Sequence, residues 1–124
     1  MESGLYIVAT PIGNLGDMSQ RAVEVLRGVD LIAAEDTRHS QRLMQHFAIE
    51  TRLMAYHDHS DARAQSRIER IIAGGGSVAL VSDAGTPLIS DPGFRLVREM
   101  QSRGFVIHPV PGPCAAIAAL SVSG

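Results

Sequence analysis

Five short apolar runs, with helical patterns between them, limit the fold of this chain more than any other feature. The runs are rich in aliphatic and β-branched residues and recur about every 25 residues, as buried strands separated by helices would. Strand alternating with helix over short connections favours a parallel sheet covered by helices. We therefore expect an α/β fold with a five-stranded, mainly parallel sheet and helices on both faces. The expected strands are residues 5–9, 30–34, 52–56, 78–82 and 105–109.

Residues that start and stop helices flank the apolar patterns between these runs. Ser19 is a suitable N-cap for a first helix that ends at Gly28. Asp91 and Pro92 predict the start of the last helix, and Gly104 predicts its end. The second helix is expected to begin at Thr37 or Ser40, and the third near Ser60 or Asp61, ending in Gly74, Gly75 and Gly76.

Composition describes a single domain of 124 residues with 45% hydrophobic content and a formal charge of −2. This charge gives no bulk attraction to nucleic acid or to an anionic membrane, so such a partner would need a local patch. A single cysteine, Cys114, excludes an internal disulfide framework, and no apolar stretch is long enough to span a bilayer. A cytoplasmic location is expected.

All 11 basic residues are arginine, and the sequence contains no lysine. This excludes a Walker A phosphate loop, a pyridoxal Schiff base and a lysine general base within this chain. The glycine fingerprint of dinucleotide-binding folds is also missing. ATP and NAD are therefore poor candidates for a ligand.

Unusual polar, glycine and proline residues follow each expected strand, at its carboxyl end. In an open α/β sheet these ends share one edge, where ligands bind. The segment after the fourth strand, "VSDAGTPLISDPG", is long for a connection, and Gly85 within it permits close approach of backbone to a ligand. The five groups are residues 10–14, 35–38, 57–59, 81–93 and 111–114.

Several of these residues allow two interpretations. His57 and His59 could be metal ligands, but without a third ligand at metal spacing a hydrogen-bonding or surface role is the alternative. Asp36 could be a general base or a helix cap. Cys114 near a helix start could be a nucleophile, although its alanine neighbours favour tight packing. The long glycine- and proline-rich segment could itself be turn chemistry alone.

Two groups of arginines share helix faces at spacings of three and four residues. Arg38 and Arg42 lie at the expected ligand edge, where Arg38 is a candidate contact for a phosphate or a ribose. Arg63, Arg67 and Arg70 form the second group, for which a solvated helix face is a sufficient explanation.

Four long motifs resemble the ribosomal RNA small subunit methyltransferase I family, a branch of the tetrapyrrole methylase superfamily. They are "LYIVATPIGNLGDMSQRAVEVLRGVDLIAAEDTRHS", "HDH", "VALVSDAGTPLISDPG" and "PVPGPCAAIAALSVSG", and the resemblance runs over essentially the whole chain. The resemblance implies a homodimeric enzyme of two domains that binds S-adenosylmethionine between them and methylates the 2′-hydroxyl of a cytidine in 16S ribosomal RNA. It also implies that residues 1–112 are the N-terminal domain and that residues 113–124 begin a second one.

The resemblance also implies roles for particular residues. The superfamily's Gly-Asp-Pro cofactor turn corresponds to Gly85, Thr86 and Pro87, so that a threonine replaces the usual aspartate. Methyl transfer from a sulfonium needs alignment above all, yet a ribose hydroxyl is a weak nucleophile that a base would help. The candidate bases are Asp36, His57 and His59, and the remaining candidate cofactor contacts are Pro11, Asp83, Ile89 and Ala115.

Two other functions are compatible with these residues. One is a methyltransferase that acts on a tetrapyrrole or another small molecule, since it would need the same cofactor edge. The other is a module that binds the cofactor without transferring the methyl group. The acidic balance of the chain argues against RNA, unless the second domain and the dimer partner supply the basic surface.

Overall fold

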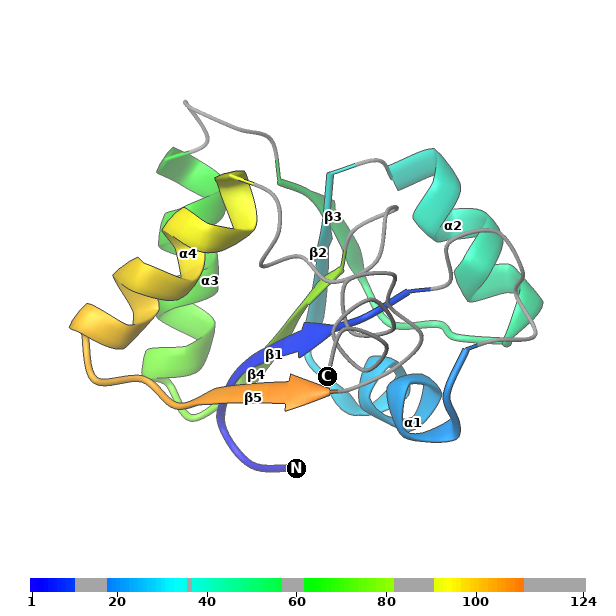
Figure 1. The fold of residues 1–124 in the computed structure, drawn as a ribbon, viewed down its shortest axis with the longest axis horizontal. Helices are drawn as coiled ribbons and strands as arrows, with labels where there is room; N and C mark the ends of the chain where they lie inside the picture. Colours follow the sequence, from blue (N-terminus) through cyan, green and yellow to red (C-terminus); the bar gives the residue numbers. More distant parts are fainter. Residues whose placement is uncertain (11–17, 36, 57–61, 82–90, 111–124) are drawn as a thin grey trace, which may run out of the picture.

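The computed structural model describes residues 1–10, 18–35, 37–56, 62–81 and 91–110, with backbone only for residues 91–94. In this part of the chain five strands alternate with four helices, as the apolar runs predict (Figure 1). The elements are β1 (Gly4–Val8), α1 (Gln20–Gly28), β2 (Leu31–Ala34), α2 (Thr37–His46), β3 (Leu53–Ala55), α3 (Ala62–Ala73), β4 (Ser77–Val81), α4 (Asp91–Ser102) and β5 (Ile107–Val110).

The strands form one sheet in the order β3-β2-β4-β1-β5, and every strand pair in the described residues is parallel. The chain first moves outward from β1 to β2 and β3. It then returns to insert β4 between β2 and β1, and finishes at the opposite edge with β5. The expected parallel sheet is confirmed, and β4 lies at its centre.

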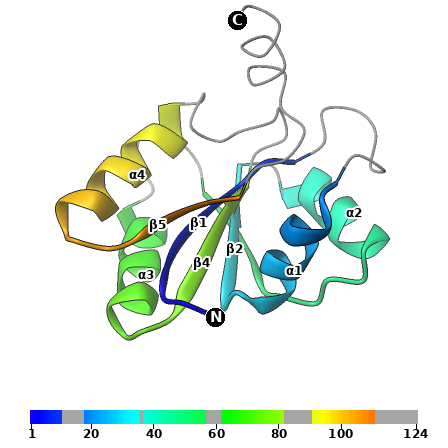
Figure 2. The ribbon, with the colours of Figure 1, turned by 60° about the horizontal axis from the view of Figure 1, so that its bottom comes forward.

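Alternate residues of the strands face opposite sides of the sheet, and each side has its own apolar core. Tyr6 and Val8 of β1 pack with the buried side chains of α1 and α2. Leu5 and Ile7 alternate with these two residues along β1, and they pack with α3 and α4 on the other side of the sheet. Figure 2 shows the two helix pairs on opposite faces of the sheet, so the prediction of helices on both faces is confirmed.

The helix boundaries follow local capping chemistry. The Ser19 side chain accepts a hydrogen bond from the Ala22 N–H at 3.1 Å, which confirms Ser19 as the N-cap of α1. α2 begins at Thr37, so Ser40, the other predicted start, lies inside the helix, where it is buried. Gly104 follows α4 with φ +80°, a conformation in which glycine ends helices with little strain.

The observed boundaries differ from the expected ones by one or two residues. β5 begins at Ile107 instead of residue 105, and α4 includes Asp91, which was predicted as its cap. Ile68 and Ile72 of α3 are buried, whereas Ile71 is half-buried because it lies at the margin of the buried stripe of the helix. No helix in the described ranges is long and apolar enough to cross a membrane.

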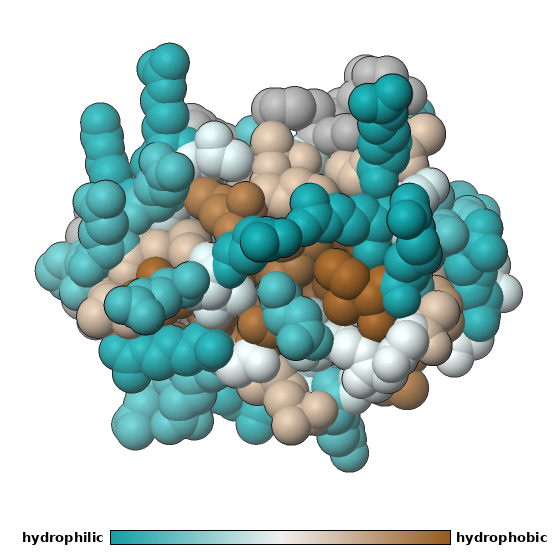
Figure 3. Space-filling model, turned by 180° about the vertical axis from the view of Figure 1, so that it is seen from behind, coloured by the Kyte–Doolittle hydropathy of each residue, from teal (hydrophilic) through white to brown (hydrophobic). Residues whose placement is uncertain are grey.

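The edge strand β3 has less cover than the other strands. Its three residues, Leu53, Met54 and Ala55, are all half-buried, whereas those of β1, β2 and β4 are buried. Figure 3 shows the molecule from behind, where long hydrophilic side chains reach across hydrophobic surface. Polar side chains thus cover part of the apolar surface on this face.

Candidate functional site

The carboxyl ends of all five strands lie along one edge of the sheet. The strand register places Val8 opposite both Val81 and Val110, and Ala34 opposite both Val81 and Ala55. The five segments that carry the unusual polar and glycine residues therefore all start from the same edge. This is the arrangement on which the prediction of a ligand site depends.

The topology makes the middle of this edge suitable for a ligand. The chain passes from β1 and β2 to α1 and α2 on one face, but from β4 to α4 on the other. β4 lies between β1 and β2, so neighbouring strands send their connections to opposite sides of the sheet. Ligands of open α/β sheets bind at such a switch point, in the crevice between the diverging connections.

Four buried side chains at this edge are small and apolar or weakly polar. Ala9, Thr10, Ala34 and Val81 are all buried where their strands end. Glu35, directly after β2, is half-buried and is the acidic side chain that the structure describes at this end of the sheet. Among the described residues, the edge thus combines small, apolar side chains with the carboxylate of Glu35.

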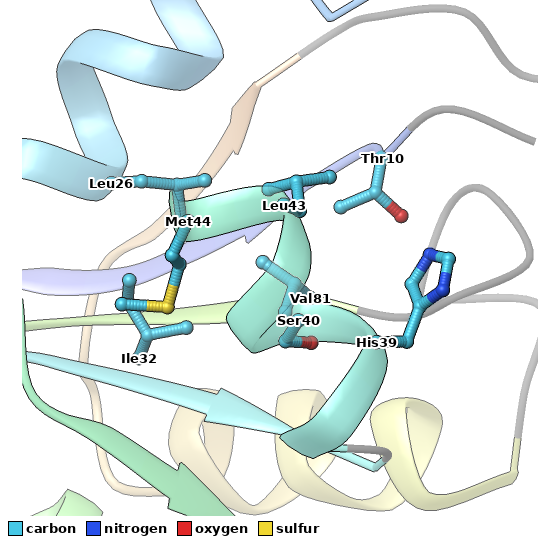
Figure 4. A pocket seen from close by; sticks show the side chains of 8 residues that line it. All are labelled: Thr10, Leu26, Ile32, His39, Ser40, Leu43, Met44 and Val81. Carbon is cyan, nitrogen blue, oxygen red and sulfur yellow. The ribbon is translucent and has the colours of Figure 1, made fainter. Parts of the chain in front are cut away.

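A small hollow lies beneath the edge, between the start of α2 and the ends of β1 and β4 (Figure 4). Its volume is about 10 Å³, which is about the space of one water molecule. Thr10 and His39 lie toward one side of the hollow, and apolar side chains line the rest. The hollow is therefore too small for a ligand as large as a nucleoside. The other lining residues are Leu26, Ile32, Ser40, Leu43, Met44 and Val81.

Arg38 is the predicted site residue that the structure describes. It lies in the first turn of α2, directly after the edge, with its side chain exposed and already engaged in an interaction. This position agrees with a contact to a ligand that extends beyond the edge. The other predicted site residues lie outside the described residues, and their roles stay predictions: Pro11, Asp36, His57, His59, Asp83, Gly85, Thr86, Pro87, Ile89 and Ala115.

Thr10 and His39 are site residues that the sequence argument did not select individually. Thr10 is the first residue after Ala9 at the end of β1, and His39 lies one residue beyond Arg38. Each of them also takes part in an interaction with another residue. Their positions after strands could have identified them, but only the packed structure shows that they line one hollow.

Comparison with known proteins identifies the family of the chain. The family model described as tetrapyrrole (corrin/porphyrin) methylases matches residues 4–124. The chain belongs to this family. The resemblance stated from the motifs is therefore confirmed, and methylases of this family use S-adenosylmethionine.

Curated relatives with high identity have one name in common. The chain is 62% identical to the ribosomal RNA small subunit methyltransferase I of Pseudomonas aeruginosa over 120 residues, which are 97% of this chain and 43% of the relative. The protein of the same name from Escherichia coli O157:H7 is 58% identical over 97% of this chain and 42% of its own length. The chain thus spans less than half the length of the curated relatives it matches.

Solved structures support the fold. A uroporphyrin-III-C-methyltransferase from Thermus thermophilus superimposes with a TM-score of 0.71 and 18% identity, over 98% of this chain and 53% of that protein. At this identity the similarity concerns the fold alone. It confirms the α/β architecture predicted from the alternating pattern.

Proposed function

We propose that this chain forms one side of the cofactor cleft of an S-adenosylmethionine-dependent methyltransferase that acts on ribosomal RNA of the small subunit. The observation that carries the proposal is the 62% identity, over nearly the whole chain, to a relative whose name states this activity. The motif resemblance adds the finer target, the 2′-hydroxyl of a cytidine in 16S ribosomal RNA.

The described residues of the edge fit such a cofactor. The buried Ala9, Ala34 and Val81 provide an apolar floor, and Thr10 adds a hydroxyl next to it. The half-buried Glu35 lies at the same edge, and its carboxylate would stabilise the positive sulfonium of the cofactor by opposite charge. When bound, S-adenosylmethionine supplies an activated methyl group that requires no metal and no covalent intermediate on the protein.

The contribution of the protein is then mainly alignment of the acceptor hydroxyl with the methyl group, a contribution that reaches about 7–11 kcal/mol in well-oriented reactions. We assign the cofactor contacts to Pro11, to Asp83 with Ile89, to Ala115 and to the turn of residues 85–87. Gly85 lacks a Cβ, so the backbone there could approach the cofactor closely. Thr86 stands where the superfamily usually has an aspartate, and we expect backbone contacts to replace the contacts of that aspartate side chain.

Proton removal from the ribose is the step in which a side chain would assist the transfer. Asp36, His57 and His59 are the proposed candidates, because in the sequence they follow the ends of β2 and β3 within two to four residues. Arg38 is proposed to hold a phosphate or ribose of the RNA, since its exposed guanidinium lies beside the same edge. Residues 113–124 are proposed to lead into a second domain, and the whole enzyme to act as a homodimer in the cytoplasm.

The test is a transfer assay on the full-length protein. It is incubated with labelled S-adenosylmethionine and small ribosomal subunits from cells that lack the modification, and the labelled nucleotide is identified. Label on a cytidine ribose supports the proposal. Label on a corrin or porphyrin offered in a parallel reaction, with none on the RNA, contradicts it. Cofactor binding without transfer to any acceptor also contradicts it.

Variants in the same assay separate the candidate bases. Loss of the true base should lower the transfer rate about 10²- to 10⁴-fold with little change in cofactor affinity. Asp36→Asn, His57→Gln and His59→Gln are compared with Arg21→Gln, an exposed change on α1. If all three variants keep the full rate, the ribose proton leaves by another route and these assignments are wrong.

A further inference from the structure

Three arginines form a row on the outer face of α3. Arg63, Arg67 and Arg70 are spaced by four and three residues, which places them on one side of a helix, and all three are exposed. The opposite side of α3 carries the buried Ala64, Ile68 and Ile72. The row lines a shallow surface depression together with Ala62 and Ser66, and no acidic residue lines it among the described residues.

The nearest acidic residues in α3 and α4 are used elsewhere. Glu69 forms an ion pair with Arg103, with 2.9 Å between Glu69 Oε1 and Arg103 Nε. The same Nε lies 3.2 Å from Oε1 of Glu99. In the described part of the chain, no ion pair involves a member of the Arg63, Arg67 and Arg70 row. The row therefore keeps its positive charge while its neighbours neutralise one another.

This side of the molecule is basic although the chain as a whole is acidic. The segments 62–73 and 91–103 hold six of the 11 arginines but only three of the 13 acidic residues. Arg95 and Arg98 of α4 line a second depression that lies beside α3 residue Gln65. Charge is thus segregated toward the α3 and α4 side.

The row also starts close to the candidate site. α3 begins at Ala62, just after the segment that follows the carboxyl end of β3, and runs back along the sheet. Arg63 therefore lies in the turn nearest the cofactor edge, and Arg70 lies about 10 Å farther along the helix at about 1.5 Å per residue. A chain of negative charges along this row would have one end at that edge.

We propose that Arg63, Arg67 and Arg70 bind the phosphate backbone of the RNA substrate beside the site of methyl transfer. This proposal rests on the function proposed above, and it adds a second surface, besides the cofactor edge, that contacts the RNA. Guanidinium groups bind phosphate through paired hydrogen bonds, and contacts to phosphate position an RNA without reading its sequence. An ordinary solvated helix face would place acidic residues at the neighbouring turns, which reduces repulsion between like charges. This row has none.

The test measures the salt dependence of RNA binding by the full-length protein. Each phosphate contact on single-stranded RNA contributes about −0.7 to the slope of log K against log salt. The triple variant Arg63→Gln, Arg67→Gln, Arg70→Gln should therefore reduce the steepness of the slope by about 2. The matched control is Arg21→Gln, Arg27→Gln, Arg52→Gln, which removes the same charge from exposed residues away from α3.

Binding is measured with a 16S ribosomal RNA fragment, and cofactor affinity of each variant reports whether the fold is intact. The expected result is a smaller slope for the α3 variant, with cofactor affinity unchanged and the control variant close to wild type. An unchanged slope for the α3 variant, or an equal reduction in the control, overturns the proposal. Binding of the row to phosphatidylserine vesicles with an unchanged RNA slope overturns it as well. Absence of methyl transfer together with a reduced slope contradicts the proposed reaction but leaves this surface as an RNA contact.

Discussion

A methyl group added at Gly4 should disturb the pairing of β1 with β5. Gly4 is buried and has φ +139°, a conformation that side chains disfavour. A Cβ there would lie 2.4 Å from the Val106 carbonyl oxygen and 2.9 Å from two atoms of the His108 ring. Because contacts below 3.0 Å are essentially never observed for a real Cβ, β5 would have to move by at least about 0.6 Å.

The neighbouring groups are held in place and cannot retreat without cost. The Val106 oxygen accepts a hydrogen bond from the Leu5 N–H at 2.9 Å. The His108 ring stacks on Tyr6 with centroids 4.3 Å apart, and its Nε2 lies 3.0 Å from the Ser3 carbonyl oxygen. Movement of β5 would therefore disturb contacts of both backbone and side chains.

Gly4→Ala should lower the free energy of unfolding by about 3–7 kcal/mol. Backbone strain contributes about 1–3 kcal/mol, overpacking about 1–3 kcal/mol and the weakened hydrogen bond about 1 kcal/mol. The measurement is urea denaturation followed by circular dichroism. Gly104→Ala is the control, because Gly104 also has positive φ but no described atom lies within 4 Å of its added Cβ. If the two variants lose the same stability to within about 1 kcal/mol, the collision with β5 is not the cause.

Three further substitutions test the capping, the buried tyrosine and the core. Ser19→Ala removes the acceptor of the Ala22 N–H and should cost about 1 kcal/mol in urea denaturation; no loss would show that water replaces the cap. Burial raises the pKa of Tyr6 above its ordinary 10.0, so stability should fall as pH rises above 10 and the unfolded state ionises first. Tyr6→Phe should reduce this alkaline loss in denaturation curves at rising pH, and an equal loss in both proteins would refute the assignment. Ile68→Ala, at a fully buried position, should cost about 2–5 kcal/mol by the same denaturation, and more than Ile71→Ala at its half-buried neighbour; equal costs would contradict the observed helix orientation.

The predicted elements agree with the structure because their signals are local. Apolar runs bounded by turn residues predict the strands, and Ser19 and Gly104 predict helix ends through hydrogen bonds and backbone conformations within a few residues. The boundary errors occur where local signals compete. Both Thr37 and Ser40 are suitable caps, and only packing of α2 against the sheet buries Ser40 inside the helix.

The candidate site was predictable only in part. The rule that ligands bind at the carboxyl ends of parallel strands selected the segments and placed Arg38 at the edge, where the structure has it. The roles of Asp36, His57, His59 and the turn of residues 85–87 stay predictions, because these residues lie outside the described ranges. Thr10 and His39 were not selected, since a shared hollow depends on contacts between separate elements.

The sequence by itself determined the alternation of strands and helices, the two-sided burial of the strands, the segments that follow them and the family. These features follow from hydrophobic period, capping residues and motifs, all of which act over a few neighbouring positions. Only the tertiary structure decided the strand order β3-β2-β4-β1-β5, the insertion of β4 at the centre and the separation of the arginine row on α3 from the paired Glu69 and Glu99. Strand order and charge separation depend on contacts between residues far apart in the chain. The local periodicity of the sequence does not indicate which distant elements pack against one another.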